Sequence, residues 1–252
     1  MSNKHFLALP VTGDTFAEIR EKNRYYVDKT PYLKTVFSED EAVDDKSLIN
    51  GTTVLLLTRP RRFGKTMLMN MFESFLNINY EKPGDTSIQD KFFKGTKILE
   101  DQKFCKKYMG QFPVISITLK DVLGDDFESA YLKLAEVVSA KANEFSFLKE
   151  SPYLNEMEKA KFNLLCDEIY LKKADKQAIS YVTSAIKSLS LMLYKHFNKQ
   201  VYILIDEYDV PLAKAQEHGY HKDMVTLMSS FLGFLKDPQK DPEKDTSIIS
   251  KV

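Results

Sequence analysis

The sequence contains little cysteine and no excess of either charge. Its 252 residues include only two cysteines, Cys105 and Cys166, whose spacing is not that of metal ligands. We therefore expect two reduced thiols rather than a disulfide framework or a structural zinc site. Lysine plus arginine and aspartate plus glutamate both number 36, so the formal net charge is zero. Overall charge thus gives no support for binding to nucleic acid or to a membrane surface, although a local basic patch would not show in this sum.

Long apolar runs are also missing. No stretch approaches the roughly 20 residues that a membrane-spanning helix needs. The apolar part of the first ten residues, MSNKHFLALP, is too short for a signal peptide. We expect a cytoplasmic protein with no membrane partner. Hydrophobic residues make up 43% and charged residues 29% of the chain, which indicates a soluble globular protein with one large domain or two small ones.

The most informative stretch is Val54 to Leu76, VLLLTRPRRFGKTMLMNMFESFL. A short apolar run, Val54 to Leu57, is typical of a buried strand, and the residues from Lys65 onward place apolar side chains at helical spacing. The turn between them ends in Gly64-Lys65-Thr66. In a phosphate-binding loop of this form, backbone N–H groups and the helix dipole bind phosphate, the lysine reaches the β and γ phosphates, and the threonine ligates Mg²⁺.

The match to the general phosphate-loop pattern is incomplete. That pattern requires glycine five residues before Gly64, where this sequence has Arg59. The alternative is an ordinary strand–turn–helix connection with a basic turn. The strand and helix flanking the turn favour the phosphate loop, because they lie where its mechanism needs them.

A second motif begins at Val201, VYILIDEYD. Five apolar residues indicate a buried strand of a parallel sheet, and Asp206 and Glu207 follow at its carboxyl end, where open α/β sheets bind their ligands. Asp206 would hold Mg²⁺ and Glu207 would polarise an attacking water. Alone, the motif could be a strand followed by a polar turn. Together with the Gly64 loop, it favours a nucleotide site.

The remaining chain predicts mostly helix. Pro113 to Leu119 is typical of a buried strand, and about 80 helix-rich residues separate it from the strand at Val201, more than one crossover requires. We therefore expect an inserted helical layer. We also expect a strand at Tyr25 to Val27, an exposed connection from Asn77 to Gly95, and helices at 16–21, 32–37, 97–108, 127–148, 154–173, 178–197 and 220–235.

Six segments carry a resemblance to a known family. They are Leu9-Pro10, Tyr25 to Thr30, Arg59 to Thr66, Lys106 to Gly110, Phe112 to Ile115 and Ile205 to Asp209. On these residues the chain resembles the AAA-ATPase-like family of bacterial and archaeal P-loop proteins, usually fused to a C-terminal nuclease-like domain of the PD-(D/E)XK type. The resemblance covers nearly all of residues 5 to 235. Arg59 departs from the general loop but not from the family's R-P-R-R-F-G-K-T.

The resemblance implies ATP and Mg²⁺ as ligands. Lys65 and Thr66 would bind phosphate and metal, and Asp206 and Glu207 would form the second acidic motif, with Lys65 and Glu207 as catalytic residues. Three more loop residues, Arg61, Arg62 and Phe63, would line the nucleotide with Gly64. The two arginines could instead form a solvated basic turn or pair with the acidic residues 39–45.

The resemblance also gives a role to the segment at Tyr25 to Lys29. In related ATPases a short element before the phosphate loop packs on the adenine, and Tyr26, Val27 and Asp28 would do so here. The alternative is a core strand in which Asp28 caps the following helix, because an aspartate before a helix commonly does so.

The last residues depart from the family. Residues 236–252 form a lysine-, aspartate- and proline-rich tail that we expect to be disordered. In the resembled proteins a further strand, carrying the residue that senses the γ phosphate, lies between the phosphate-loop strand and the acidic-motif strand. Without it the sheet would be incomplete. The two strands could then pair directly, another chain or a full-length relative could complete the sheet, or the sequence could be a truncated remnant.

The sequence therefore predicts an α/β fold of the P-loop NTPase type. A parallel sheet flanked by helices would carry an inserted helical layer, with residues 1–235 as the ATPase-like domain. The predicted function is ATP binding with Mg²⁺; the requirements for hydrolysis are only partly present, and Mg²⁺-dependent hydrolysis is expected in the complete family context. The alternatives are a non-catalytic or degenerate nucleotide-binding interaction module, and phosphate transfer to a small molecule or nucleoside, for which no acceptor pocket is identified. No residues match the nuclease-like domain, so its activity is not carried over.

Overall fold

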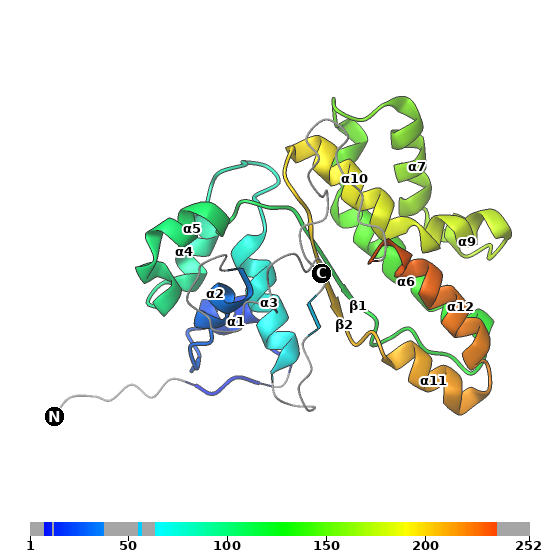
Figure 1. Ribbon diagram of the computed structural model, residues 1–252, viewed down its shortest axis with the longest axis horizontal. Helices are drawn as coiled ribbons and strands as arrows, with labels where there is room; N and C mark the ends of the chain where they lie inside the picture. The colour runs from blue at the N-terminus through cyan, green and yellow to red at the C-terminus, as the bar shows by residue number, and fades with distance from the viewer. Residues whose placement is uncertain (1–7, 12, 38–54, 57–63, 236–252) are drawn as a thin grey trace. The chain divides into compact units, whose positions relative to one another are not determined.

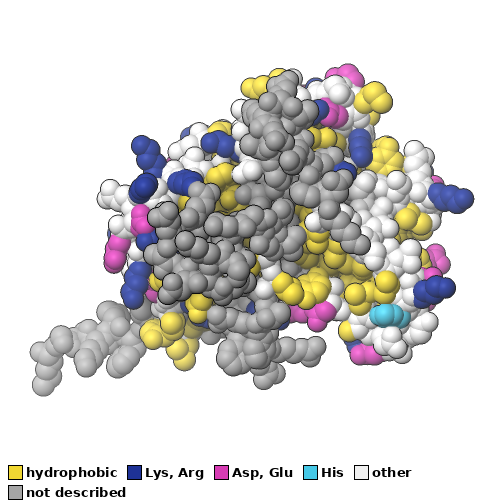
Figure 2. Space-filling view, in the orientation of Figure 1, with side chains coloured by type: hydrophobic (Ala, Val, Ile, Leu, Met, Phe, Trp, Pro, Cys, Tyr) yellow, Lys and Arg dark blue, Asp and Glu magenta, His cyan; other side chains and the backbone are white. Residues whose placement is uncertain are grey.

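The computed structural model describes residues 8–11, 13–37, 55–56 and 64–235. Contacts divide the chain into two compact units, Met1–Val114 and Ile115–Val252. Figure 1 shows the helices and strands of both, and each unit is described by itself. The face shown in Figure 2 carries both basic and acidic side chains.

The first unit is helical in its described part. Helix α3 (Lys65–Leu76) contacts both α1 (Phe16–Glu21) and α4 (Ser87–Phe93), and a parallel bridge joins Asn77 to Phe112. The apolar stripe predicted for the helix after Gly64 is confirmed, because Leu68, Met71, Phe72, Phe75 and Leu76 are all buried. The elements are α1 (Phe16–Glu21), α2 (Pro31–Phe37), α3 (Lys65–Leu76), α4 (Ser87–Phe93), η1 (Lys97–Glu100) and α5 (Gln102–Tyr108).

Two predictions for the first unit are wrong. No strand forms at Tyr25 to Val27, where the described backbone is irregular and both Tyr25 and Val27 are exposed. The segment from Asn77 to Gly95 is not simply an exposed connection, because it contains α4 and the fully buried Phe93. Aromatic packing explains the difference, since the Phe93 ring lies 4.9 Å from that of Phe16 and 5.2 Å from that of Phe75.

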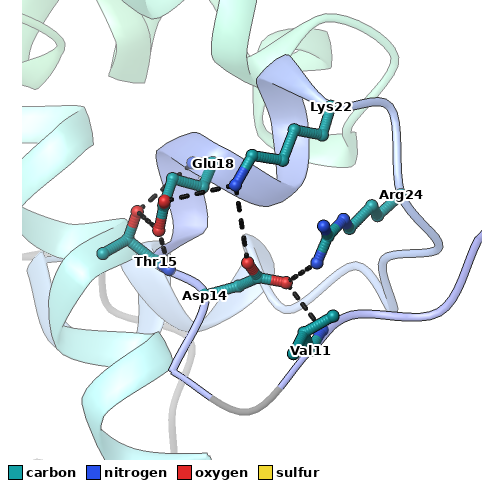
Figure 3. A network of polar contacts seen from close by, with 6 residues as sticks. All are labelled: Val11, Asp14, Thr15, Glu18, Lys22 and Arg24. Carbon is teal, nitrogen blue, oxygen red and sulfur yellow. Dashed lines mark hydrogen bonds and ion pairs between the residues drawn. The ribbon is translucent and has the colours of Figure 1, made fainter.

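A polar network fixes the start of the first unit (Figure 3). Thr15 and Glu18 form a capping box that satisfies backbone N–H groups at the beginning of α1. The Asp14 carboxylate accepts hydrogen bonds from the backbone N–H of Val11 and from the Arg24 guanidinium. Lys22 lies 3.8 Å from the same carboxylate. The chain leaving α1 at Arg24 is thereby held against the turn that enters it, which positions the segment that follows.

The second unit contains both strands and most of the helices. Side-chain caps start several helices: Asp126 accepts from the Ser129 N–H, Asn155 forms a capping box with Glu158, and Asp175 accepts from the Ala178 N–H. The elements are β1 (Val114–Thr118), α6 (Phe127–Glu144), η2 (Ser146–Glu150), α7 (Glu156–Cys166), α8 (Glu168–Leu171), α9 (Lys176–Thr183), α10 (Ala185–Phe197), β2 (Tyr202–Asp206), α11 (Val210–His218), α12 (His221–Phe231) and η3 (Gly233–Leu235).

The two predicted strands at Pro113 and Val201 are confirmed, and they pair with each other. β1 and β2 run side by side as a parallel two-stranded sheet (Figure 1), and the Leu119 N–H donates to the Asp206 carbonyl at 3.0 Å. The predicted helical layer is also confirmed, because α6 to α10 lie between β1 and β2 in the chain. The described chain is thus helix-rich with a small parallel sheet, which is compatible with the predicted α/β class.

Other predicted elements lie outside the described residues. Val54 and Leu57 of the predicted phosphate-loop strand are among them; of that segment only Leu55 and Leu56 are described, and neither is in a strand. The predicted gap between this strand and β2, and the predicted tail at 236–252, therefore stay predictions. The prediction of one ATPase-like domain over residues 1–235 also stays a prediction.

Candidate functional site

Helix α3 begins with a glycine in a left-handed conformation. Gly64, the residue before the helix, has φ 74° and ψ 31°, and it offers no side chain to cap the helix. Its carbonyl accepts the first helical hydrogen bond, from the Leu68 N–H at 2.9 Å. The N–H groups of the first turn therefore have no cap from this residue, and the helix dipole adds positive potential at the same place. Such a helix start is suited to an anion.

Lys65 and Thr66 form the first turn of α3. Thr66 is exposed and Lys65 is half-buried. The buried stripe of α3 begins two residues later, at Leu68, so packing fixes the helix while its first two residues stay accessible. The neighbouring predicted site residues Arg61, Arg62 and Phe63 lie outside the described residues, and their roles stay predictions.

Tyr26 packs against α3. Its hydroxyl lies 3.3 Å from the sulfur of Met71 and accepts a hydrogen bond of 3.1 Å from the Lys29 N–H. Its ring meets that of Phe16 edge-on at 5.3 Å. Burial raises the pKa of Tyr26 to about 12, so the phenol is neutral near pH 7. The structure therefore brings the predicted adenine-side residue Tyr26 next to the helix that carries Lys65.

Asp28 and Thr30 hold the same segment in place. The Asp28 carboxylate accepts from the backbone N–H of Thr30 at 2.9 Å and from that of Lys97 at 2.8 Å. The buried Thr30 hydroxyl accepts from the Ile98 N–H at 3.2 Å. Although burial acts to raise it, the pKa of Asp28 lies below its ordinary value because of the hydrogen bonds from Lys97 and Thr30. These contacts support an anchoring role, close to the cap that the sequence allowed, whereas adenine contact by Asp28 stays a prediction.

Lys29 is a residue that the sequence assigned no role. A β-carbon added at Gly64 would lie only 2.9 Å from the Lys29 ammonium nitrogen, so this nitrogen lies directly against the start of α3. In the described part of the chain, no carboxylate pairs with the ammonium of Lys29 or of Lys65. No spacing rule links residues 29 and 64, so only the folded chain could reveal this contact.

The acidic motif lies at the carboxyl end of β2. Asp206 ends the strand, and its carboxylate accepts from the Glu207 N–H at 3.0 Å. Glu207 has φ 54°, a left-handed conformation that is strained for a residue with a side chain. Its carbonyl accepts from the Val210 N–H, which leads directly into α11. The two acids are therefore held in a tight turn between a partly buried strand and a helix.

The predicted Mg²⁺ ligands, Thr66 and Asp206, are both oxygen donors, and their joint binding of the metal stays a prediction. Within the described residues, no group of three or more His, Cys, Asp and Glu side chains could hold a metal alone. Mg²⁺ commonly uses one or two protein oxygens together with phosphate and water. The Thr66 hydroxyl and the Asp206 carboxylate are oxygen donors of that kind. Lys65 and Thr66 belong to the first unit and Asp206 and Glu207 to the second, so each half of the candidate site is described in its own unit.

Other features lie apart from these residues. A pocket of about 370 Å³ in the first unit is lined by residues including Asn70, Glu73 and Gln89, and by none of the predicted site residues. Cys105 and Cys166 form no disulfide, and burial raises the pKa of both thiols, that of Cys105 to about 11. Among the helices that the structure describes, none is long and apolar enough to cross a membrane.

Comparison with known proteins gives one match. The model of the AAA-ATPase-like family, described as predicted AAA-ATPase, matches residues 10–246. The match spans both units, and with them the Gly64 loop and the acidic motif at Asp206. No curated protein and no solved structure matches the chain.

Proposed function

Because the chain belongs to the AAA-ATPase-like family of predicted AAA-ATPases, we propose that it is a P-loop domain that binds ATP with Mg²⁺ and hydrolyses it. The observation that carries this proposal is the start of α3. There, left-handed Gly64 precedes Lys65 and Thr66, and no carboxylate among the described residues pairs with Lys65. A helix start at which positive charge has no carboxylate partner among the described residues fits a polyphosphate.

Each group has a proposed role. The N–H groups at the start of α3 and the Lys65 ammonium bind the β and γ phosphates, and Tyr26 forms part of the surface that receives the base. Thr66 and Asp206 hold Mg²⁺, which neutralises charge on the phosphate oxygens when it is bound. Glu207 orients the water that attacks the γ phosphorus and accepts its proton. Arg61 and Arg62 supply additional positive charge from the loop.

The test combines binding and turnover. We expect the wild-type chain to bind ATP in calorimetry and to release phosphate in a coupled assay. Lys65→Ala should lose binding, because it removes the cation at the helix start. Glu207→Gln should keep binding and lose turnover by about 100-fold or more, the range for a general base. Lys82→Ala, which removes an exposed lysine of the same unit, serves as the control and should leave both unchanged.

The outcomes separate the candidate functions. Unchanged ATP affinity in Lys65→Ala contradicts the site assignment. Stoichiometric binding without phosphate release in the wild-type chain favours the nucleotide-binding interaction module over the hydrolase. Phosphate release that persists in Glu207→Gln contradicts only the catalytic role of Glu207 and leaves the nucleotide site in place.

A further inference from the structure

Three consecutive residues of the first unit, Asp28, Lys29 and Thr30, differ in their side-chain contacts. The side chains of Asp28 and Thr30 anchor the segment, and Lys29 carries a positive charge between them. The outer two are engaged with the backbone of η1: Asp28 accepts from the Lys97 N–H and Thr30 from the Ile98 N–H. The backbone of Lys29 is also engaged, since its N–H donates to the Tyr26 hydroxyl and its carbonyl accepts from the Tyr32 N–H. Within the described residues, the Lys29 side chain makes no hydrogen bond or ion pair that holds this segment.

That side chain ends at the start of α3. The 2.9 Å approach of its nitrogen to a β-carbon built at Gly64 places an ammonium group against the left-handed residue that opens the helix. Lys65 follows immediately. Two lysines therefore lie at the positive end of one helix dipole, and in the described part of the chain neither has a carboxylate partner. Like charges gathered this way repel one another unless an anion joins them.

We propose that Lys29 is a second phosphate-binding residue, which contacts the β or γ phosphate of a nucleoside triphosphate at the start of α3. This inference rests on the proposed function and adds a specificity determinant to it: affinity should depend on a polyphosphate chain. Gly64 suits its position because its backbone is left-handed; a side chain there would also meet the flexible end of Lys29, which would have to shift. Asp28 and Thr30 are then positioning residues that aim Lys29.

The experiment is calorimetry on the full chain with four probes: ATP, ADP, AMP and inorganic tripolyphosphate. Lys29→Met should weaken ATP and tripolyphosphate binding about tenfold, the usual scale for one charge-assisted hydrogen bond. AMP binding should be unchanged. Lys29→Arg should keep most of the affinity, because it retains a cation of similar reach. The salt dependence of ATP binding should be smaller in Lys29→Met than in wild type.

Controls separate a phosphate contact from a fold defect. Lys82→Met removes another lysine of the same unit and should match wild type with every probe. Circular dichroism checks that each variant is folded, and Lys29→Gln, which keeps a polar side chain of similar length, replaces Lys29→Met if the latter unfolds. Equal weakening of ATP and AMP would indicate a structural role and overturn the inference, as would wild-type ATP affinity in both neutral variants.

The same titrations distinguish failure of this inference from failure of the proposed function. If ATP binding is lost in Lys65→Ala but unchanged in folded Lys29→Met, the nucleotide site stands and the Lys29 role is wrong. If the wild-type chain binds neither ATP nor tripolyphosphate, the proposed function itself is refuted, and the role of Lys29 with it.

Discussion

The start of α3 and the end of β2 have similar backbone geometry but side chains of opposite charge. In each, the backbone passes through a left-handed residue next to a regular element: Gly64 at φ 74° before α3 and Glu207 at φ 54° after β2. The first turn is followed by Lys65 and lies against the Lys29 nitrogen, and the second carries two carboxylates. One end is suited to phosphate and the other to a cation or a water.

The difference lies in which residue occupies the left-handed position. Glycine adopts that conformation without steric penalty, whereas a residue with a β-carbon is strained by about 1–2 kcal/mol. A glycine at position 207 would relieve this strain but would remove the carboxylate. Gly64 therefore suits its backbone, whereas Glu207 carries a carboxylate at a strained position, as Asn23, Ala174 and Asn198 carry side chains at theirs.

The largest expected effect is on stability, and it tests the aromatic packing that holds α3 in the first unit. Phe75 is fully buried, with ring centroids 5.2 Å from Phe93 and 5.9 Å from Phe104. Phe75→Ala should lower the free energy of unfolding by about 3–5 kcal/mol, because it leaves a cavity in this aromatic cluster. Urea denaturation measures the change. Ile88→Ala, at a side chain 51% exposed, is the control and should change stability by less than about 1 kcal/mol. A loss below about 1 kcal/mol in Phe75→Ala would show that this packing does not support α3.

The next effect tests the anchor beside α3. Asp28→Ala removes the acceptor of two backbone N–H groups and should lower the free energy of unfolding by about 2 kcal/mol, with partial exposure limiting the loss. Asp28→Asn, which keeps one acceptor oxygen, should lose less. If both variants are as stable as wild type, Asp28 does not anchor this segment.

The anchor also predicts a pH dependence. The pKa of Asp28 is lower in the folded chain than its ordinary value of 3.8, so the unfolded chain binds the proton more readily. Its stabilising contribution is present above pH 3.8 and is lost as the pH falls through the folded pKa. Urea denaturation from pH 6 to pH 3 should show a steeper loss below about pH 4 in wild type than in Asp28→Ala. Identical slopes would contradict this assignment.

The smallest expected effect is on stability, at the two left-handed positions 64 and 207. At each, the glycine form should be more stable than the alanine form by about 1 kcal/mol, because only alanine carries the strained β-carbon. The comparison uses wild type against Gly64→Ala at one site, and Glu207→Gly against Glu207→Ala at the other, by thermal denaturation. Glu207→Gly should lose turnover despite its favourable backbone. If Glu207→Ala is as stable as Glu207→Gly, the left-handed backbone at position 207 is not strained by a side chain.

Much of the local structure could be predicted from the sequence. The helix after Gly64, the strands at Val114 and Tyr202, and the helix-rich stretch between these strands all follow from apolar periodicity and from caps such as Asp126. The strand predicted at Tyr25 to Val27 was wrong because short runs of tyrosine and valine favour strands only when a neighbouring strand pairs with them. Here Tyr26 is fixed by side-chain contacts to Phe16 and Met71 instead.

The sequence by itself determined the motifs, the helices and strands that flank them, and the family to which they point. Those signals are local, because a cap or an apolar stripe depends on residues within about four positions of one another. Only the tertiary structure decided that β1 pairs with β2, that the Asp28 carboxylate accepts from the Lys97 backbone N–H, and that the Lys29 ammonium lies against Gly64. These contacts join residues far apart in the chain, and they depend on packing that no local pattern encodes.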